Sequence, residues 1–103
     1  MEEFGFPRDG FKFSKESTTN SRDSFYKYVF ELIIADKKAG GPFAGCNFWG
    51  WGGFANPSKE HIYWQKRDDY CGDPAQEEQG LNSVFASDKS TVKIIKESVL
   101  KFK

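Results

Sequence analysis

The sequence predicts an α/β fold in which short strands run parallel and alternate with helices. Two observations lead to this prediction. Apolar side chains recur over 21–38 at the spacing of one buried helix face, and an apolar run at 43–49 follows almost directly. A strand end, a helix and a strand in this order form a βα unit, whose strands pair in parallel.

The first elements are a strand end and a long helix. Residues 1–6 place alternating phenylalanines before Pro7, which indicates the end of a strand that enters a loop. A helix over 21–38 is expected to be capped by Asn20 or Ser21, and Gly40 and Gly41 end it. The side chains expected on its buried face are Phe25, Tyr28, Val29, Leu32 and Ile33.

The stretch 41–53 is the part around which the rest of the chain is organised. Its apolar run 43–49 is bounded by glycines on both sides, which predicts a strand buried on both faces. Trp49 and Trp51 stand among glycines at its end, where exposed ring faces form a floor for a flat ligand such as a sugar ring. By residue type alone, tryptophans in small domains are more often packing residues.

Residues 50–86 show no strong periodicity and predict a long loop, in which a short strand at 83–85 is an option. His61 in this loop is expected to be exposed and without a role. A second helix is expected over 88–101, capped by Ser87 or Asp88. The apolar side chains expected on its buried face are Val92, Ile94, Ile95, Val99 and Leu100.

Composition excludes several classes of function. The 103 residues carry 15 Lys and Arg against 15 Asp and Glu, so there is no electrostatic case for nucleic acid or an anionic membrane. The apolar runs are too short to span a bilayer, and the N-terminus lacks the pattern of a signal peptide, so the localisation stays undetermined. Cys46 and Cys71 match no metal-binding spacing, and both a disulfide and two free thiols fit them.

Aromatic residues make up 17% of the chain, which is more than so small a domain can readily bury. Either an aromatic face binds a ligand, or other protein covers some of the rings.

Several motifs resemble one family in the same order along the chain. They are Glu2-Glu3-Phe4-Gly5, then Asn47-Phe48-Trp49-Gly50-Trp51-Gly52-Gly53, and then the segment from Tyr63-Trp64 through Gly72-Asp73-Pro74 to Ser83-Val84-Phe85. Together they are similar to the C-terminal part of an endo-β-1,4-mannanase of glycoside hydrolase family five, a retaining (β/α)8-barrel enzyme. The resemblance implies a partial barrel with long loops. Residues 1–6 would be the end of strand seven, and 43–49 would be strand eight.

The resemblance also implies site residues. Glu3 matches the family's catalytic nucleophile, and Glu2 is disfavoured because its side chain belongs to the other face of the strand. Trp49 matches the tryptophan that floors the subsite where the bond is cut. Trp51 and Trp64 would contribute to substrate binding from the following loop, although packing in the loop is the favoured interpretation of Trp64. The reaction requires two carboxyl groups, and no cofactor or metal is implied.

The sequence departs from the family in what it lacks. The family's acid/base glutamate follows an asparagine at the end of strand four, and no Asn-Glu pair occurs here. A complete barrel needs about 250 residues, so the chain corresponds to roughly the last two βα units. We therefore expect no hydrolysis of β-mannan or a related polysaccharide by these residues alone. The parent family is usually secreted or periplasmic.

Two further expectations follow. Exposed sheet edges predict that the chain forms a homo-oligomer or complements the missing barrel segment. The alternative function is a small carbohydrate-binding or interaction module that uses an aromatic face, which an all-β fold would favour.

Overall fold

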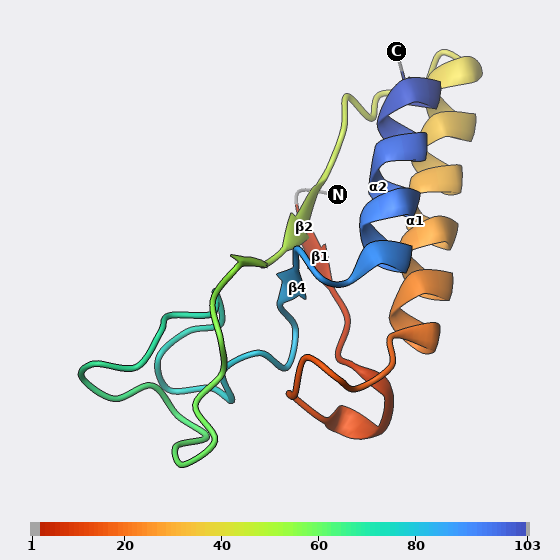
Figure 1. Cartoon of the computed structure of the whole chain (residues 1–103). Coiled ribbons are helices and arrows are strands. Elements are labelled where there is room, and N and C mark those ends of the chain that lie inside the picture. The colour runs from red at the N-terminus through yellow and green to blue at the C-terminus, as the bar shows by residue number, and fades with distance from the viewer. Residues whose placement is uncertain (1–2, 103) are drawn as a thin grey trace.

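The computed structural model describes residues 3–102, and within them two long helices pack on one side of short parallel strands (Figure 1). The elements are β1 (Glu3–Gly5), the 3₁₀ helix η1 (Asp9–Phe11), α1 (Asn20–Lys38), β2 (Asn47–Trp49), β3 (Trp51–Gly53), β4 (Val84–Phe85) and α2 (Lys89–Phe102). Strand β1 pairs in parallel with β2, and β3 pairs in parallel with β4. The predicted α/β class with parallel strands is confirmed.

An aromatic cluster joins β1 to α1. Phe4 is buried, and its ring centroid lies 4.9 Å from that of Tyr26 and 5.5 Å from that of Phe30, both edge to face. Aromatic pairs favour this geometry because the positive ring edge meets the negative face of its neighbour. The cluster fixes which face of the two-stranded sheet is covered by α1.

The buried face of α1 differs from the predicted one. Val29 and Ile33 are buried as predicted, but Tyr26 is buried too, and Tyr28 and Leu32 are exposed. The helix lies against β1 and β2 on one side and against α2 on another, which turns Tyr26 inward and leaves Tyr28 and Leu32 on the outer side. Helical spacing alone does not say where such a stripe is centred.

A carboxylate from the preceding loop caps α1. Thr19 stands at the cap position without a side-chain cap bond, and neither Asn20 nor Ser21 caps the helix as predicted. Instead, Asp9 accepts hydrogen bonds from the backbone N–H groups of Asn20 at 2.8 Å and Ser21 at 3.0 Å. The loop after β1 is thereby attached to the start of the helix, where the helix dipole also favours a negative charge.

The predicted strand 43–49 is wrong in length and in burial. Only Asn47–Trp49 is a strand, and its outer residues are exposed. The reason is pairing: the register begins at Glu3 opposite Asn47, so the described residues give 43–46 no partner. A strand neighboured on one side only is not buried on both faces.

The long loop predicted over 50–86 contains two strands. The chain continues through a cis peptide bond between Trp49 and Gly50 into β3, which pairs with β4. The short strand considered at 83–85 is therefore present as β4, whereas β3 was missed because glycines occupy two of its three positions.

Helix α2 is less buried than its apolar stripe predicts. Val99 and Leu100 are 50% and 71% exposed, and Val92, Ile94 and Ile95 are only partly buried. Among the described elements α2 packs mainly on α1, so one side of its stripe is covered and the other faces solvent. Neither helix of residues 3–102 combines the length and apolarity that crossing a bilayer requires.

Two buried arginines connect the loops to the helices. Arg22 of α1 donates to the carbonyl oxygens of Phe6 at 2.9 Å, Ser83 at 2.8 Å and Leu81 at 3.0 Å. Arg8 donates to the Asp88 carboxylate, which also lies 3.6 Å from Arg22. Burial lowers the pKa of Arg22, and the Arg8 charge lowers it further. One carboxylate therefore serves as the counter-ion of two adjacent buried cations, and backbone carbonyl oxygens accept their other hydrogen bonds.

We predict that Asp88→Asn destabilises the protein by about 3 kcal/mol or more, because two buried guanidinium groups lose their counter-ion. Urea unfolding followed by circular dichroism measures this. Lys93→Gln is the control: it removes an exposed ion pair with Glu97 at 3.8 Å and should change stability by less than about 0.5 kcal/mol. Equal effects of the two substitutions would contradict the importance of the buried pair.

Asp9 should make stability depend on acid pH. Hydrogen bonds from Thr18 and from the backbone of Ser21 and Asn20 lower its pKa from 3.8 to about 2. A lowered folded-state pKa adds stability above the unfolded pKa, and this is lost as pH falls toward the folded value. Asp9→Asn should thus lower the thermal midpoint at neutral pH, and its difference from the wild type should shrink between pH 3.8 and about 2.

The control for this titration is Glu31→Gln, at an exposed position in the middle of α1. It should leave the thermal midpoint close to that of the wild type. A gap between Asp9→Asn and the wild type that stays constant down to pH 2 would argue against an ionised cap.

Candidate active site

The site begins with the two faces of the β1–β2 sheet. Phe4 and its register partner Phe48 lie on the face that meets α1. Side chains alternate along a strand, and register partners share a face, so Glu3 and Gly5 lie on the opposite face together with Asn47 and Trp49. Glu3 is exposed there.

Trp49 lies against the end of β1. A Cβ atom on Gly5, its register partner, would stand 3.4 Å from the Trp49 Cβ and 3.0 Å from its carbonyl oxygen. Because Gly5 has no side chain, Trp49 has room to lie beside β1, the strand that carries Glu3. The carbonyl is also fixed from the covered face, where the Tyr26 hydroxyl donates to it at 3.3 Å.

The Tyr26 hydroxyl is a structural group. Burial raises its pKa to about 12, so it keeps its proton and remains a donor to the Trp49 carbonyl at neutral pH. Trp49 itself is 38% exposed, which places it at a surface and not in the core.

Asn47 was missed by the sequence reasoning. It is the register partner of Glu3, and it is exposed on the same face. Neighbouring strands lie about 4.8 Å apart, so a ligand that reaches Glu3 also meets this amide. The signal was available, because Asn47 stands two positions before Trp49 and period two puts both on one face.

Trp51 is carried by β3 and is 55% exposed. Its indole lies across Gly53, where an added Cβ would stand 3.3 Å from the Trp51 Nε1. Gly53 has a φ of +58°, a conformation that side chains disfavour, so both backbone shape and space require glycine here. The pairing of β3 with β4 then sets the position of Trp51.

A family model for glycoside hydrolase family 5 β-mannosidase-like proteins matches residues 1–103, the entire chain. The chain belongs to this family. The predicted resemblance is confirmed at this level.

Solved structures of a glycoside hydrolase family 5 mannosidase from Rhizomucor miehei agree with this assignment. One aligns with a TM-score of 0.84 at 30% identity over 99% of this chain and 26% of that chain. Two variants of the same enzyme, each with a different glutamate replaced by alanine, align equally well, and one of them is in complex with mannosyl-fructose. No curated protein matches this chain. The chain thus spans about a quarter of the length of the structures it matches.

In this family member Trp64 is tied into its own loop. Its indole N–H donates to the Asp68 carbonyl oxygen at 2.9 Å, while the ring is 38% exposed. His61, expected to have no role, instead places Nδ1 3.0 Å from an Asp68 carboxylate oxygen. The same carboxylate accepts from the Gln65 N–H at 3.0 Å, so the segment closes on itself as a compact turn.

A buried polar cluster holds the far end of this loop. Asp73 accepts from the Gly80 N–H at 2.8 Å and from the Ser83 hydroxyl at 2.9 Å. Gln79 accepts from the Cys71 N–H at 3.0 Å and donates to the Asp73 carbonyl oxygen at 2.7 Å. These bonds hold this end of the loop together through its own backbone and side chains.

The two thiols are free, which decides between the two options left open by the sequence. Burial, together with the Asp69 and Asp73 charges, raises the pKa of Cys71 to about 11, and burial also raises that of Cys46. Both are therefore neutral at pH 7. Among residues 3–102, no three His, Cys, Asp or Glu side chains gather where they could hold a metal ion.

Proposed function

We propose that these residues supply the nucleophile side of the active site of a retaining β-mannan hydrolase, with Glu3 as the nucleophile. The observation that carries the proposal is the register of β1 and β2, which sets Glu3 and Trp49 on one exposed face away from α1. Membership of the β-mannosidase-like family supports the choice of substrate class.

The chemistry follows from two carboxyl groups. A Glu3 carboxylate oxygen would attack the anomeric carbon while the bond to the leaving oxygen breaks and that oxygen takes a proton from an acid group. Water would then hydrolyse the glycosyl ester. A retaining site needs the acid group about 5 Å from the nucleophile. The proton donor would come from outside these residues, in keeping with two different glutamates having been replaced in the Rhizomucor miehei enzyme.

The corresponding fold is part of a (β/α)8 barrel. In this proposal β1 and β2 are the ends of the last two barrel strands, and α1 and α2 are the helices that follow them. Barrel enzymes bind substrates at the carboxyl ends of their strands. Trp49 is the last residue of β2, Trp51 follows two positions later, and Glu3 lies two residues before the carboxyl end of β1.

Trp49 would be the floor under the sugar whose bond is cut. A sugar presents C–H groups on its flat face, and an aromatic ring offers the matching apolar surface. Trp51 would extend this surface from β3. Trp64 would contribute only its exposed ring face, because its N–H is bonded within the loop.

The substrate in this proposal is β-1,4-mannan. The solved structures that this chain matches are those of a mannosidase, and one of them contains mannosyl-fructose. The comparison therefore supports recognition of mannose more directly than cleavage inside a polymer. The alternative of a free-standing sugar-binding module loses its main structural argument, since the described fold contains two helices and is not all-β.

A chimera tests the role of Glu3. These residues replace the matching quarter of the Rhizomucor miehei mannosidase, with which they align at a TM-score of 0.84. The chimera should hydrolyse an aryl β-mannoside, and Glu3→Gln in it should reduce kcat by about 10⁴-fold or more, since the covalent step loses its nucleophile. Circular dichroism and gel filtration establish that both forms fold alike.

Glu2→Gln is the matched control, because it makes the same change one residue earlier and should leave kcat within about twofold. The 103-residue polypeptide alone should show no turnover of soluble mannan, because a missing general acid costs about 10²–10⁴-fold. An active chimera that is indifferent to Glu3→Gln would exclude Glu3 as the nucleophile.

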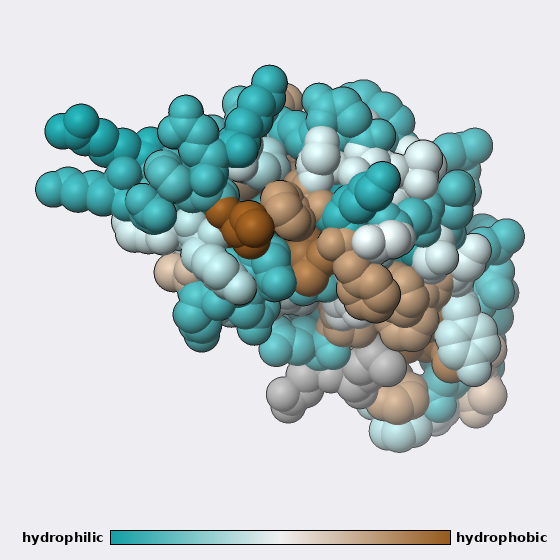
Figure 2. Space-filling model, turned by 90° about the horizontal axis from the view of Figure 1, so that it is seen from below, coloured by the Kyte–Doolittle hydropathy of each residue, from teal (hydrophilic) through white to brown (hydrophobic). Residues whose placement is uncertain are grey.

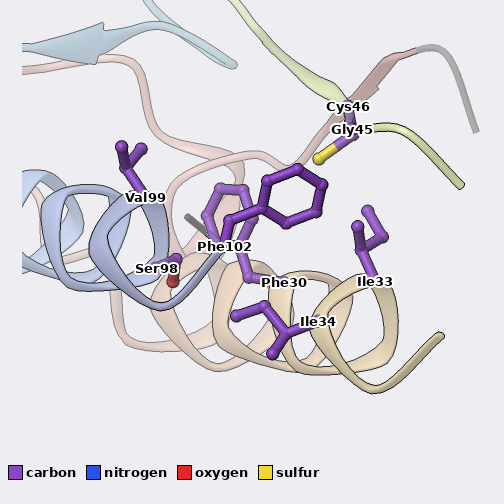
Figure 3. A pocket seen from close by; sticks show the side chains of 8 residues that line it. All are labelled: Phe30, Ile33, Ile34, Gly45, Cys46, Ser98, Val99 and Phe102. Carbon is purple, nitrogen blue, oxygen red and sulfur yellow. The ribbon is translucent and has the colours of Figure 1, made fainter. Parts of the chain in front are cut away.

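We also propose that the purified polypeptide covers its open surfaces with a second copy. An apolar hollow of about 260 Å³ lies between α1, α2 and the segment before β2. Figure 3 shows Phe30, Ile33 and Ile34 of α1 and Val99 and Phe102 of α2 around it, with the Cys46 thiol pointing toward the phenylalanine rings. In a complete barrel, further barrel units would cover these surfaces and the strand edges.

Light scattering after gel filtration should therefore give a mass of at least twice 11.8 kDa for the folded polypeptide. Val99→Ser and Leu100→Ser together should shift this mass toward the monomer, because they remove apolar area exposed on α2. A folded, cooperative monomer across the accessible concentration range would contradict self-association.

A further inference from the structure

A second hollow lies between the loop after β1 and the loop after β3. It has a volume of about 550 Å³ and is lined by two short segments, 13–16 and 56–59. Pockets that bind small ligands measure about 300–1,000 Å³, so its size suits one sugar unit or two. Both loops follow strands at their carboxyl ends, the end at which the candidate active site lies.

The two sides of this hollow are held together by contacts from outside it. A Cβ atom on Gly80 would stand 2.7 Å from the Phe13 carbonyl oxygen and 3.0 Å from the Pro57 ring, so the Gly80 backbone fits tightly between the two segments. The buried Asp73 carboxylate in turn fixes the Gly80 N–H at 2.8 Å. The hollow is therefore preformed, which lowers the entropic cost of binding.

Its polar groups bridge the two segments. Lys15 Nζ donates to the Asn56 Oδ1 at 3.0 Å, which directs the NH₂ of that amide away from the lysine. The Ser58 oxygen accepts from the N–H groups of Glu60 at 3.1 Å and His61 at 3.0 Å, so its own proton is available to a ligand. An amide and a hydroxyl donor thus lie on one side of the hollow.

The charges are interleaved and not of one sign. Glu16 lies on the same wall as Lys15 and opposite Lys59. The Ser14 hydroxyl, and more weakly the charges of Lys59 and Lys15, lower the pKa of Glu16, which keeps it ionised at neutral pH. A phosphate or sulfate would meet this carboxylate, whereas a neutral polyol can donate to Glu16 and accept from the lysines at once.

Apolar surface is also present. Phe13 and Pro57 are half-buried members of the lining, one on each segment. Together with the polar groups of the lining, they give the hollow the apolar surface and polar rim that a pyranose ring requires. On the whole face of the molecule seen from below in Figure 2, apolar side chains gather near the middle with polar side chains around them.

We propose that this hollow is an accessory saccharide subsite that binds a neutral hexose unit through Asn56, Ser58, Lys15 and Glu16. The proposal rests on the proposed function, because it takes the ligand to be a mannose unit of the same polysaccharide substrate. It adds a binding position that neither Glu3 nor the tryptophans provide.

The test is a titration of the full chain with β-1,4-mannotriose, followed by ¹⁵N amide chemical shifts. Shifts are expected at 13–16 and 56–59. Asn56→Asp should weaken this binding about tenfold, because the amide donor is lost. The aspartate carboxylate can still accept the hydrogen bond from Lys15. If Asn56 served only to hold Lys15, Asn56→Asp would therefore change neither the affinity for mannotriose nor the thermal midpoint. Asn20→Asp, the same change at an exposed position outside the hollow, should have no effect on affinity.

Glu3→Gln separates this inference from the proposed function. Shifts at 13–16 and 56–59 that persist in Glu3→Gln and weaken in Asn56→Asp would support the subsite even if the chimera showed Glu3 to be dispensable. Chemical-shift changes confined to Trp49 and Trp51, or no changes at all, would overturn the subsite. They would not affect the assignment of Glu3 as the nucleophile, which the chimera tests separately. Shifts at the hollow with inorganic phosphate but not with mannotriose would also overturn it.

Discussion

The buried contact of Arg8 and Arg22 with Asp88 is the interaction on which the other features depend. It joins the loop after β1, helix α1 and the start of α2, while the same guanidinium groups bind the carbonyl oxygen of Ser83. Taking guanidinium groups out of water is costly unless a carboxylate and hydrogen-bond acceptors face them, so these segments come together around Asp88 and the Ser83 carbonyl oxygen. That arrangement places β4 beside β3, and β3 carries Trp51.

The β1–β2 sheet divides structural from chemical roles by the alternation of side chains. Phe4 and Phe48 anchor the sheet to α1, and Glu3 and Trp49 are turned to the other face by the same geometry. A shift of register by one residue would exchange the two sets. The aromatic cluster around Phe4 therefore fixes the orientation of the proposed nucleophile without touching a substrate.

The exposed apolar surface has a simple physical origin. The chain matches about a quarter of the length of its structural neighbours, and the part that the structure describes forms two sheets of two strands each. Short sheets leave edges without partners, and α2 is covered mainly by α1. The loops on the side of the candidate site are nevertheless well satisfied, because Asp73, Gln79 and Asp9 bond their backbone groups internally. The backbone groups of these loops thus find hydrogen-bond partners within the loops and at the start of α1, whereas the sheet that carries Glu3 has open edges.

By itself the sequence determined the α/β class, the family and the positions of both helices to within a residue or so, because helical periodicity and the tryptophan-glycine motif are local signals. It did not determine which side of each helix is buried, since Tyr28, Leu32 and Val99 depend on what packs beside them. Nor did it show that Asp9 caps α1, that Asp88 pairs with two arginines, or that Asn47 lies next to Glu3. Each of these joins segments that pack together or pair only in the folded chain, and such contacts are decided by tertiary structure alone.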